Sequence, residues 1–210
     1  MITIVDYGYG NIFSISSAFK KIGYECIITS EKEEIINSSI LVLPGVGSFK
    51  QAMDALEKKK LKNIIFNQVN EGKNIIGICL GYQMLFQYSS EFGIHDGLGL
   101  IKGKVVSLEK FSEGNARVPN VGWRPLIINK KNNILNKKYD GEMVYFVHSF
   151  VPSVEIENQI SSFIKYDKSI IHASIHNKNI VGYQFHPEKS GNVGLNILDS
   201  TIKYFKKNKS

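Results

Sequence analysis

The segment Asn74–Gln83, NIIGICLGYQ, leads from an apolar run into one of only two cysteines in the chain. Its residues 75–78 predict a buried strand, and Gly77 and Gly81 stand two residues before and after Cys79. A strand that passes straight into a helix must turn within about two residues, which strains the residue at the apex and requires small neighbours. The segment therefore predicts a nucleophile elbow in an α/β fold, with the Cys79 thiol held at the top of a sheet.

The first half of the chain alternates short β-rich runs with amphipathic segments. This alternation is typical of an open, mostly parallel sheet with helices on both faces. We expect strands at residues 2–5, 25–29, 40–43 and 75–78, with helices at residues 11–22 and 49–56.

After Gly97 the pattern changes to β-rich runs separated by turn residues, which predict an antiparallel or mixed β extension beside the first sheet. Residues 193–205 carry an apolar stripe that predicts a C-terminal helix packed on the sheet. Neither a repeat nor a low-complexity linker divides the sequence, so we expect residues 1–210 to form a single domain. The β-rich runs are residues 104–108, 124–128, 143–147, 161–165, 170–175 and 180–185.

The composition favours a soluble cytoplasmic protein. With 210 residues and 43% hydrophobic content, the chain can bury a core without disulfides, so Cys26 and Cys79 are compatible with a reducing compartment. No leader-like start or apolar run of membrane-spanning length is present in the sequence. The formal charge of +7 comes from scattered lysines without interleaved aromatic residues, so we expect neither a nucleic acid nor a membrane as partner.

Cys79 has the sequence context of a reactive thiol. The first turn of a helix favours the thiolate form, and the Leu80 amide follows the nucleophile at the place where an oxyanion would form. The alternative is a small buried core residue, but a core cysteine does not need glycine on both sides. Cys26 lies within a predicted strand without such glycines, and we interpret it as a packing residue.

His186 is the first candidate for the base that a thiolate requires. It ends the apolar run 180–185, and Pro187 excludes a helical conformation for it, so His186 and Glu188 are expected to project from the same side. A carboxylate beside an imidazole fixes its tautomer and stabilises the imidazolium. His148 is the competing base. Because His172 and His176 share a strand face without a third ligand, we expect no metal site, and no cofactor is indicated.

Pro44–Gly47, PGVG, forms a second glycine-rich turn after a predicted strand. In an open α/β sheet such turns meet at the carboxyl ends of the strands, where ligands bind. The amides of Gly45, Val46 and Gly47 are therefore candidates to complete an oxyanion site. Any glycine-rich loop after this strand would look similar, so the motif alone does not decide between a functional and a structural turn.

Taken together, these motifs resemble those of the class I glutamine amidotransferases. The resemblance covers essentially the whole chain. Within this family, the motifs most resemble those of the glutaminase subunits of imidazole glycerol phosphate synthases. It rests on DYGYGN at residues 6–11, LPGVG at 43–47, GICLGYQ at 77–83, VPNVGW at 118–123, YFVHSF at 145–150 and FHPEKSG at 185–191.

The resemblance implies that Cys79 attacks the side-chain amide of glutamine, releases ammonia and forms a thioester that water hydrolyses. His186 would act as base and acid, and Glu188 would orient it. By position, the oxyanion site comprises Gly45, Val46, Gly47 and Leu80, and the substrate contacts comprise Gln83, Glu91, Ser149 and Phe150.

The resemblance also implies a heterodimer with a separate (βα)8-barrel cyclase subunit, which receives the ammonia through a channel and makes imidazole glycerol phosphate in histidine biosynthesis. Glutaminase activity would be low until the partner binds its ligand and the PGVG segment rearranges. The residues expected to face the partner are Tyr7, Gly10, Asn11, Asn120, Trp123 and Lys189.

The sequence departs from the family pattern at Asn120, where histidine is usual, and at Arg124, where asparagine is usual. The departure leaves the partner's identity open, since a paralogous glutaminase that supplies ammonia for amidation of a bacterial surface sugar would share the other motifs. A stand-alone thiol hydrolase and a non-catalytic binding module with a buried Cys79 are the alternatives from other functional classes.

Overall fold

An eight-stranded sheet runs through the middle of the molecule, in the order β2-β1-β3-β4-β14-β13-β12-β9. The computed structural model describes residues 1–112, 117–131 and 134–208. The first five strands of this order are parallel, as the alternating sequence pattern predicts. They are β2 (Cys26–Thr29), β1 (Ile2–Val5), β3 (Ile40–Leu43), β4 (Asn74–Ile78) and β14 (Ile180–Tyr183).

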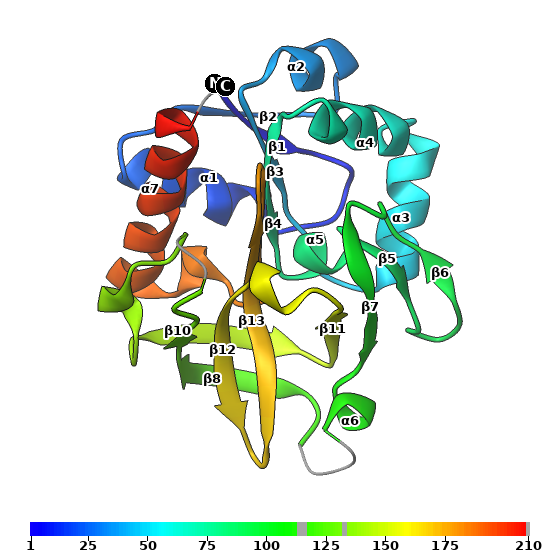
Figure 1. Cartoon of the computed structure of the whole chain (residues 1–210). Coiled ribbons are helices and arrows are strands. Elements are labelled where there is room, and N and C mark those ends of the chain that lie inside the picture. The colour runs from blue at the N-terminus through cyan, green and yellow to red at the C-terminus, as the bar shows by residue number, and fades with distance from the viewer. Residues whose placement is uncertain (113–116, 132–133, 209–210) are drawn as a thin grey trace.

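Helices cover both faces of the parallel strands (Figure 1). On one face lie α1 (Ile12–Lys21) and α7 (Gly191–Lys207), and on the other lie α3 (Phe49–Lys58) and α4 (Lys62–Asn70). Successive residues of a strand point to opposite faces, so Ile76 and Ile78 of β4 pack with the α1 and α7 side chains whereas Ile75 packs with those of α3 and α4. The prediction of helices on both faces is confirmed. The short helix α2 spans Lys32–Asn37.

The predicted β extension is present and has three parts. β13 (Ser169–Asn177), β12 (Ile160–Tyr166) and β9 (Ile127–Ile128) continue the central sheet with antiparallel pairing. β8 (Asn120–Pro125) and β10 (Met143–His148) pair only with each other among the described strands. A third sheet contains β11 (Phe150–Val154), β7 (Ile101–Ser107), β5 (Phe86–Ser89) and β6 (His95–Asp96).

The sequence pattern did not predict the strands β5, β6 and β11 or the helices α2 and α4, and it joined two separate strands in one run at residues 124–128. Buried Leu126 separates β8 from β9 at that point, and its backbone bonds to residues 141 and 142 instead. The remaining short elements are the helices α5 (Leu80–Gln83) and α6 (Leu108–Phe111) and the 3-10 turns Lys137–Tyr139, Glu157–Gln159 and Pro187–Lys189. No helix in the described ranges has the length and apolar character needed to cross a membrane.

Candidate active site

Cys79 forms the apex of a sharp turn between β4 and α5 (Figure 1). Its backbone has φ 54° and ψ −110°, a strained conformation for a residue with a side chain. A Cβ atom on Gly77 would lie 2.7 Å from the Tyr82 Cα atom, and one on Gly81 would collide with the Leu43 carbonyl oxygen. The predicted elbow and its need for glycine on both sides are confirmed, although the helix that follows has only one turn.

His186 lies near Cys79 because their strands are neighbours. β4 and β14 are parallel, Ile78 pairs with Tyr183, and the Cys79 amide donates to the Tyr183 carbonyl at 2.7 Å. The chain then leads through Gln184 and Phe185 to His186, whose own amide donates to the Tyr145 carbonyl of β10 at 2.9 Å. The backbone of His186 is extended, as Pro187 predicts. The prediction that the segment stays extended through Glu188 is wrong, because residues 187–189 form a 3-10 turn.

His186 and Glu188 form a buried pair. His186 Nδ1 lies 2.7 Å from Glu188 Oε1, and the two side chains are 2% and 0% exposed. Burial by itself lowers the pKa of the His186 imidazole, but the nearby Cys79 sulfur and the Glu188 carboxylate outweigh it and raise the pKa to about 10. His186 Nε2 has no hydrogen-bond partner of ordinary geometry in the described part of the chain.

The competing base, His148, already uses both of its ring nitrogens. Nδ1 lies 2.9 Å from the Phe150 carbonyl oxygen, and Nε2 lies 2.9 Å from Asn120 Nδ2. Burial lowers the pKa of the His148 imidazole to about 4. The hydrogen bond with Phe150 opposes this effect, and the charge of His186 adds a smaller lowering contribution. A neutral ring with two partners is poorly suited to take the thiol proton, so the geometry favours His186 as the base.

The PGVG turn packs directly on the elbow. A Cβ atom on Gly45 would lie 2.5 Å from the Gly81 amide nitrogen and 2.7 Å from Leu80 Cβ. Gly47 has φ +97°, which favours glycine, and Val46 is 41% exposed. The structure thus brings Gly45 together with Leu80, as predicted for an oxyanion site.

The Asp6–Asn11 turn holds the other end of this loop. The Tyr7 hydroxyl donates to the Pro44 carbonyl oxygen at 2.6 Å, and a Cβ atom on Gly10 would lie 2.9 Å from Pro44 Cβ. Asn11 is half-buried and accepts a hydrogen bond from the Ser14 hydroxyl. The Asp6–Asn11 turn and the PGVG loop are therefore in contact at Pro44.

The predicted substrate residues fall into two places. Gln83 is buried beside Phe150, and its Nε2 donates to the Phe150 carbonyl at 2.9 Å. Glu91 instead accepts a 2.6 Å hydrogen bond from the amide of Phe49, the first residue of α3. Its neighbour Phe92 has its ring 6.3 Å from that of Phe150, which connects the two places. Ser149, which directly precedes Phe150 in the chain, is half-buried.

The predicted partner-facing residues differ in exposure. Trp123 is 45% exposed, Lys189 is exposed, and Gly10 and Asn11 are half-buried. Tyr7 and Asn120 are 1% and 0% exposed, so both side chains are enclosed by the chain itself, in contrast to the prediction that they face a partner. Tyr7 is bound to Pro44, and Asn120 points inward to His148.

Gln184 is a polar neighbour of the thiol that the sequence analysis did not identify. It is fully buried, its Oε1 accepts from Gln83 Nε2 at 3.0 Å, and its Nε2 lies 3.9 Å from the Cys79 sulfur. The available signal was an amide side chain inside the apolar run 180–185, since a buried polar group needs partners.

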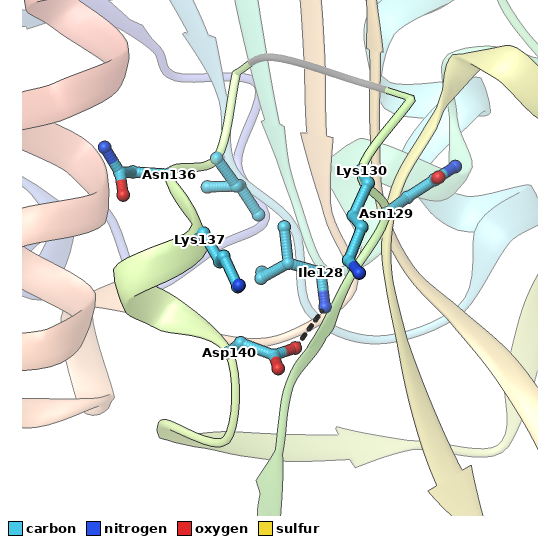
Figure 2. A pocket seen from close by; sticks show the side chains of 7 residues that line it. Ile128, Asn129, Lys130, Asn136, Lys137 and Asp140 are labelled. Atoms are coloured by element: carbon cyan, nitrogen blue, oxygen red, sulfur yellow. Dashed lines mark hydrogen bonds between the residues drawn. The ribbon is translucent and has the colours of Figure 1, made fainter.

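A separate pocket of about 380 Å³ lies between β9 and the Lys137–Tyr139 turn (Figure 2). Its polar groups serve local backbone turns: Asp140 Oδ1 accepts from the Ile128 amide at 2.9 Å, and Asn136 Oδ1 accepts from the Lys138 amide at 2.9 Å. The pocket is lined by Ile128, Asn129, Lys130, Leu135, Asn136, Lys137 and Asp140, which include no predicted site residue. Residues 1–112, 117–131 and 134–208 contain no group of three histidine, cysteine or acidic residues placed to hold a metal ion.

The chain is similar in sequence to known proteins. Residues 3–202 match the family model described as "Glutamine amidotransferase class-I". The chain is 41% identical to imidazole glycerol phosphate synthase subunit HisH of Oceanobacillus iheyensis, over 94% of this chain and 96% of the relative. It is 38% identical to the HisH subunit of Aquifex aeolicus, over 94% and 93% of the two chains.

Solved structures share the fold at lower sequence identity. A crystal structure of a glutamine amidotransferase superimposes with a TM-score of 0.75 at 16% identity, covering 99% of this chain and 98% of that one. A structure of PurLQS from Thermotoga maritima gives a TM-score of 0.71 at 21% identity, covering 97% of each chain.

Proposed function

Since the chain belongs to the class I glutamine amidotransferases, we propose that it is the glutaminase subunit of an imidazole glycerol phosphate synthase in histidine biosynthesis. The name carried by relatives that are 38–41% identical over almost their whole length supports this assignment. The observation that carries the chemistry is the strained Cys79 elbow beside the buried pair of His186 and Glu188. In this proposal the 210 residues act as one glutaminase domain.

Cys79 is the nucleophile. Its thiolate attacks the side-chain amide carbon of glutamine, and the resulting oxyanion is stabilised by the Leu80 amide and the amides of the Gly45–Gly47 loop. The C–N bond then breaks as the amide nitrogen takes the proton from His186 Nε2 and leaves as ammonia. The product of this step is a glutamyl thioester on Cys79.

His186 serves both half-reactions. Its raised pKa keeps a proton on the imidazole beside the thiolate, so an acid is available for the leaving nitrogen. In the second half-reaction, neutral His186 takes a proton from water as the water oxygen attacks the thioester, and glutamate is released as the Cys79 sulfur leaves. Glu188, which accepts from Nδ1, keeps Nε2 directed at the reacting atoms.

The acceptor of the ammonia is a (βα)8-barrel cyclase docked on the hairpin of β8 and β10, with which the chain forms a heterodimer. Ammonia released into water at neutral pH is protonated and loses its nucleophilicity, so a closed path to a second subunit is required. Trp123 pairs with Tyr145 and Val121 pairs with Val147, which gives the hairpin one apolar face. Its members Val121, Trp123, Met143 and Val147 are 48%, 45%, 43% and 39% exposed.

The contacts of Pro44 suggest how docking would regulate hydrolysis. Tyr7 and Gly10 hold Pro44, and the loop that follows packs on Leu80 and Gly81. A partner that shifts the Asp6–Asn11 turn would reposition the Gly45–Gly47 amides at the oxyanion site. Activity in the isolated chain is therefore expected to be low.

Active-site labelling tests this function. The chain, alone and with the cyclase, is treated with a diazoketone analogue of glutamine, and the adduct is located by peptide mass spectrometry. The proposal predicts an adduct on Cys79 and none on Cys26. Absence of labelling at Cys79 in the presence of the cyclase would refute the glutaminase assignment, and rapid glutamine hydrolysis by the chain alone would favour a stand-alone hydrolase.

A further inference from the structure

A chain of polar contacts runs inward from the hairpin of β8 and β10. Arg124 Nε donates to Asn120 Oδ1 at 3.2 Å, and Asn120 Nδ2 lies 2.9 Å from His148 Nε2. His148 Nδ1 lies 2.9 Å from the Phe150 carbonyl oxygen. The mechanism proposed above assigns no role to Arg124, Asn120 or His148.

The contacts continue from Phe150 to the thiol. The Phe150 carbonyl also accepts from Gln83 Nε2 at 2.9 Å, and the same amide group donates to Gln184 Oε1 at 3.0 Å. Gln184 Nε2 is then directed at the Cys79 sulfur, 3.9 Å away. The sulfur also lies 3.9 Å from the Val147 carbonyl oxygen of β10, to which the thiol can donate.

The direction of each hydrogen bond in the outer part follows from its two ends, because the Phe150 carbonyl only accepts and the Arg124 guanidinium only donates. A guanidinium group only donates, so the Asn120 carbonyl oxygen must face Arg124 and the Asn120 amino group must face His148. His148 Nε2 is then the acceptor, and the ring proton resides on Nδ1, where it is donated to Phe150. Reversal of any one group would place two donors or two acceptors against each other in a buried site.

Arg124 also touches the strand that carries the apolar face. Its Nη1 donates to the Trp123 carbonyl at 3.3 Å and its Nη2 to the Val121 carbonyl at 3.5 Å, while the guanidinium carbon lies 4.9 Å from the centre of the Tyr166 ring. Trp123 and Val121 point outward, whereas Asn120 points inward. The Arg124 side chain therefore contacts both the backbone of the exposed apolar face and the buried side chain of Asn120.

We propose that Arg124 and Asn120 are positioning residues that fix the tautomer of His148, and that His148 thereby orients the Phe150 carbonyl and, through Gln83 and Gln184, the surroundings of the Cys79 sulfur. This inference rests on the proposed function, because it assumes that Cys79 is the nucleophile. It places the docking hairpin and the glutamine site in direct polar contact.

Two substitutions of His148 separate its two contacts. Asparagine can place its amide nitrogen near the Nδ1 position and keep the donor to Phe150, whereas glutamine reaches the Nε2 position and loses that donor. In the complex with the cyclase, we expect His148→Gln to raise the KM for glutamine about tenfold and His148→Asn about twofold or less, with ammonia-dependent synthesis unchanged in both. Equal KM values for the two variants would overturn the proposal.

Nitrogen-15 NMR of the histidines in the isolated chain tests the tautomer directly. In the unsubstituted chain we expect the His148 proton on Nδ1. In Arg124→Met we expect this single tautomer to be lost, and the KM for glutamine in the complex to rise approximately fivefold. Arg117→Met is the matched control, since Arg117 is the only other arginine in the chain and is exposed. A proton on Nε2, or an Arg124→Met chain that matches the control in both measurements, would overturn the relay.

The tests separate this inference from the proposed function. An unsubstituted complex without glutamine turnover would refute the function, whereas the NMR measurement needs no turnover and would still decide whether Arg124 sets the tautomer. If Arg124→Met does not fold, Arg124→Lys provides the same comparison, because lysine lacks the fork that holds Asn120, Trp123 and Val121 at once.

Discussion

Gly45 and Gly81 lie against each other, and neither has room for a side chain. A Cβ atom on Gly45 would lie 2.5 Å from the Gly81 amide nitrogen, and one on Gly81 would collide with the Leu43 carbonyl oxygen. The end of β3 and the turn after Cys79 therefore support each other. This contact keeps the two proposed sources of oxyanion amides together.

Gly81→Ala is expected to destabilise the protein by roughly 3 kcal/mol or more, because the added methyl meets backbone atoms that cannot move aside without breaking the elbow. Denaturant unfolding measures this loss. Gly72→Ala is the control: the same methyl enters open space there and costs only about 1 kcal/mol of left-handed strain. Equal stability of the two variants would show that the elbow accommodates a side chain.

Both Glu188→Gln and His186→Asn are expected to reduce the glutamine-dependent kcat of the complex. The Glu188→Gln variant should keep a kcat about ten times that of His186→Asn, because an orienting group contributes less than the base. Ammonia-dependent synthesis should stay at the original rate in both variants. A Glu188 variant that is as inactive as the His186 variant would assign Glu188 a direct part in proton transfer.

Buried His148 predicts a dependence of stability on pH. Its pKa falls from 6.5 to about 4 on folding, so the unfolded chain binds the proton more readily between these values. The contribution of the neutral His148 ring to the free energy of unfolding is fully present above pH 6.5. It is lost as the pH falls toward 4, and the loss amounts to up to about 3 kcal/mol. We expect the free energy of unfolding of His148→Asn to fall less between pH 7.5 and 4.5 than that of the unsubstituted chain. Parallel pH profiles would contradict the prediction.

Trp123→Asp is expected to weaken binding of the cyclase by about thirtyfold or more, since an exposed aromatic residue on an apolar face is a typical hot spot. Titration calorimetry measures the affinity. Phe66→Asp is the control, because Phe66 is 39% exposed on α4, away from β8 and β10 (Figure 1). In the unsubstituted chain Trp123 is the only tryptophan, so its fluorescence should also report docking. Equal affinity of both variants would place the interface elsewhere.

The elbow was predictable because its constraint is local. A residue with φ 54° between a strand and a helix requires its glycines within two positions, so Gly77 and Gly81 reveal it in the sequence. The pair of His186 and Glu188 was predicted from an extended segment, whereas the two side chains in fact meet at a 3-10 turn that begins at Pro187.

The contacts of Asn120 were less accessible from the sequence. Side chains along a strand alternate, so Asn120 and Trp123, three positions apart, cannot both face a partner. Which of them points outward depends on the pairing of β8 with β10 and on His148, 28 residues later. Gln184 meets Cys79 and Gln83, which lie 105 and 101 residues away in the chain, and no local pattern conveys these contacts.

The role of Cys79 as the nucleophile is tested most directly by Cys79→Ala in the complex with the cyclase, with glutamine or with ammonia as nitrogen source. The account predicts that glutamine-dependent synthesis disappears whereas ammonia-dependent synthesis continues at the rate of the unsubstituted complex. Loss of both activities would show that Cys79 is structural, and continued use of glutamine would show that another residue attacks the amide.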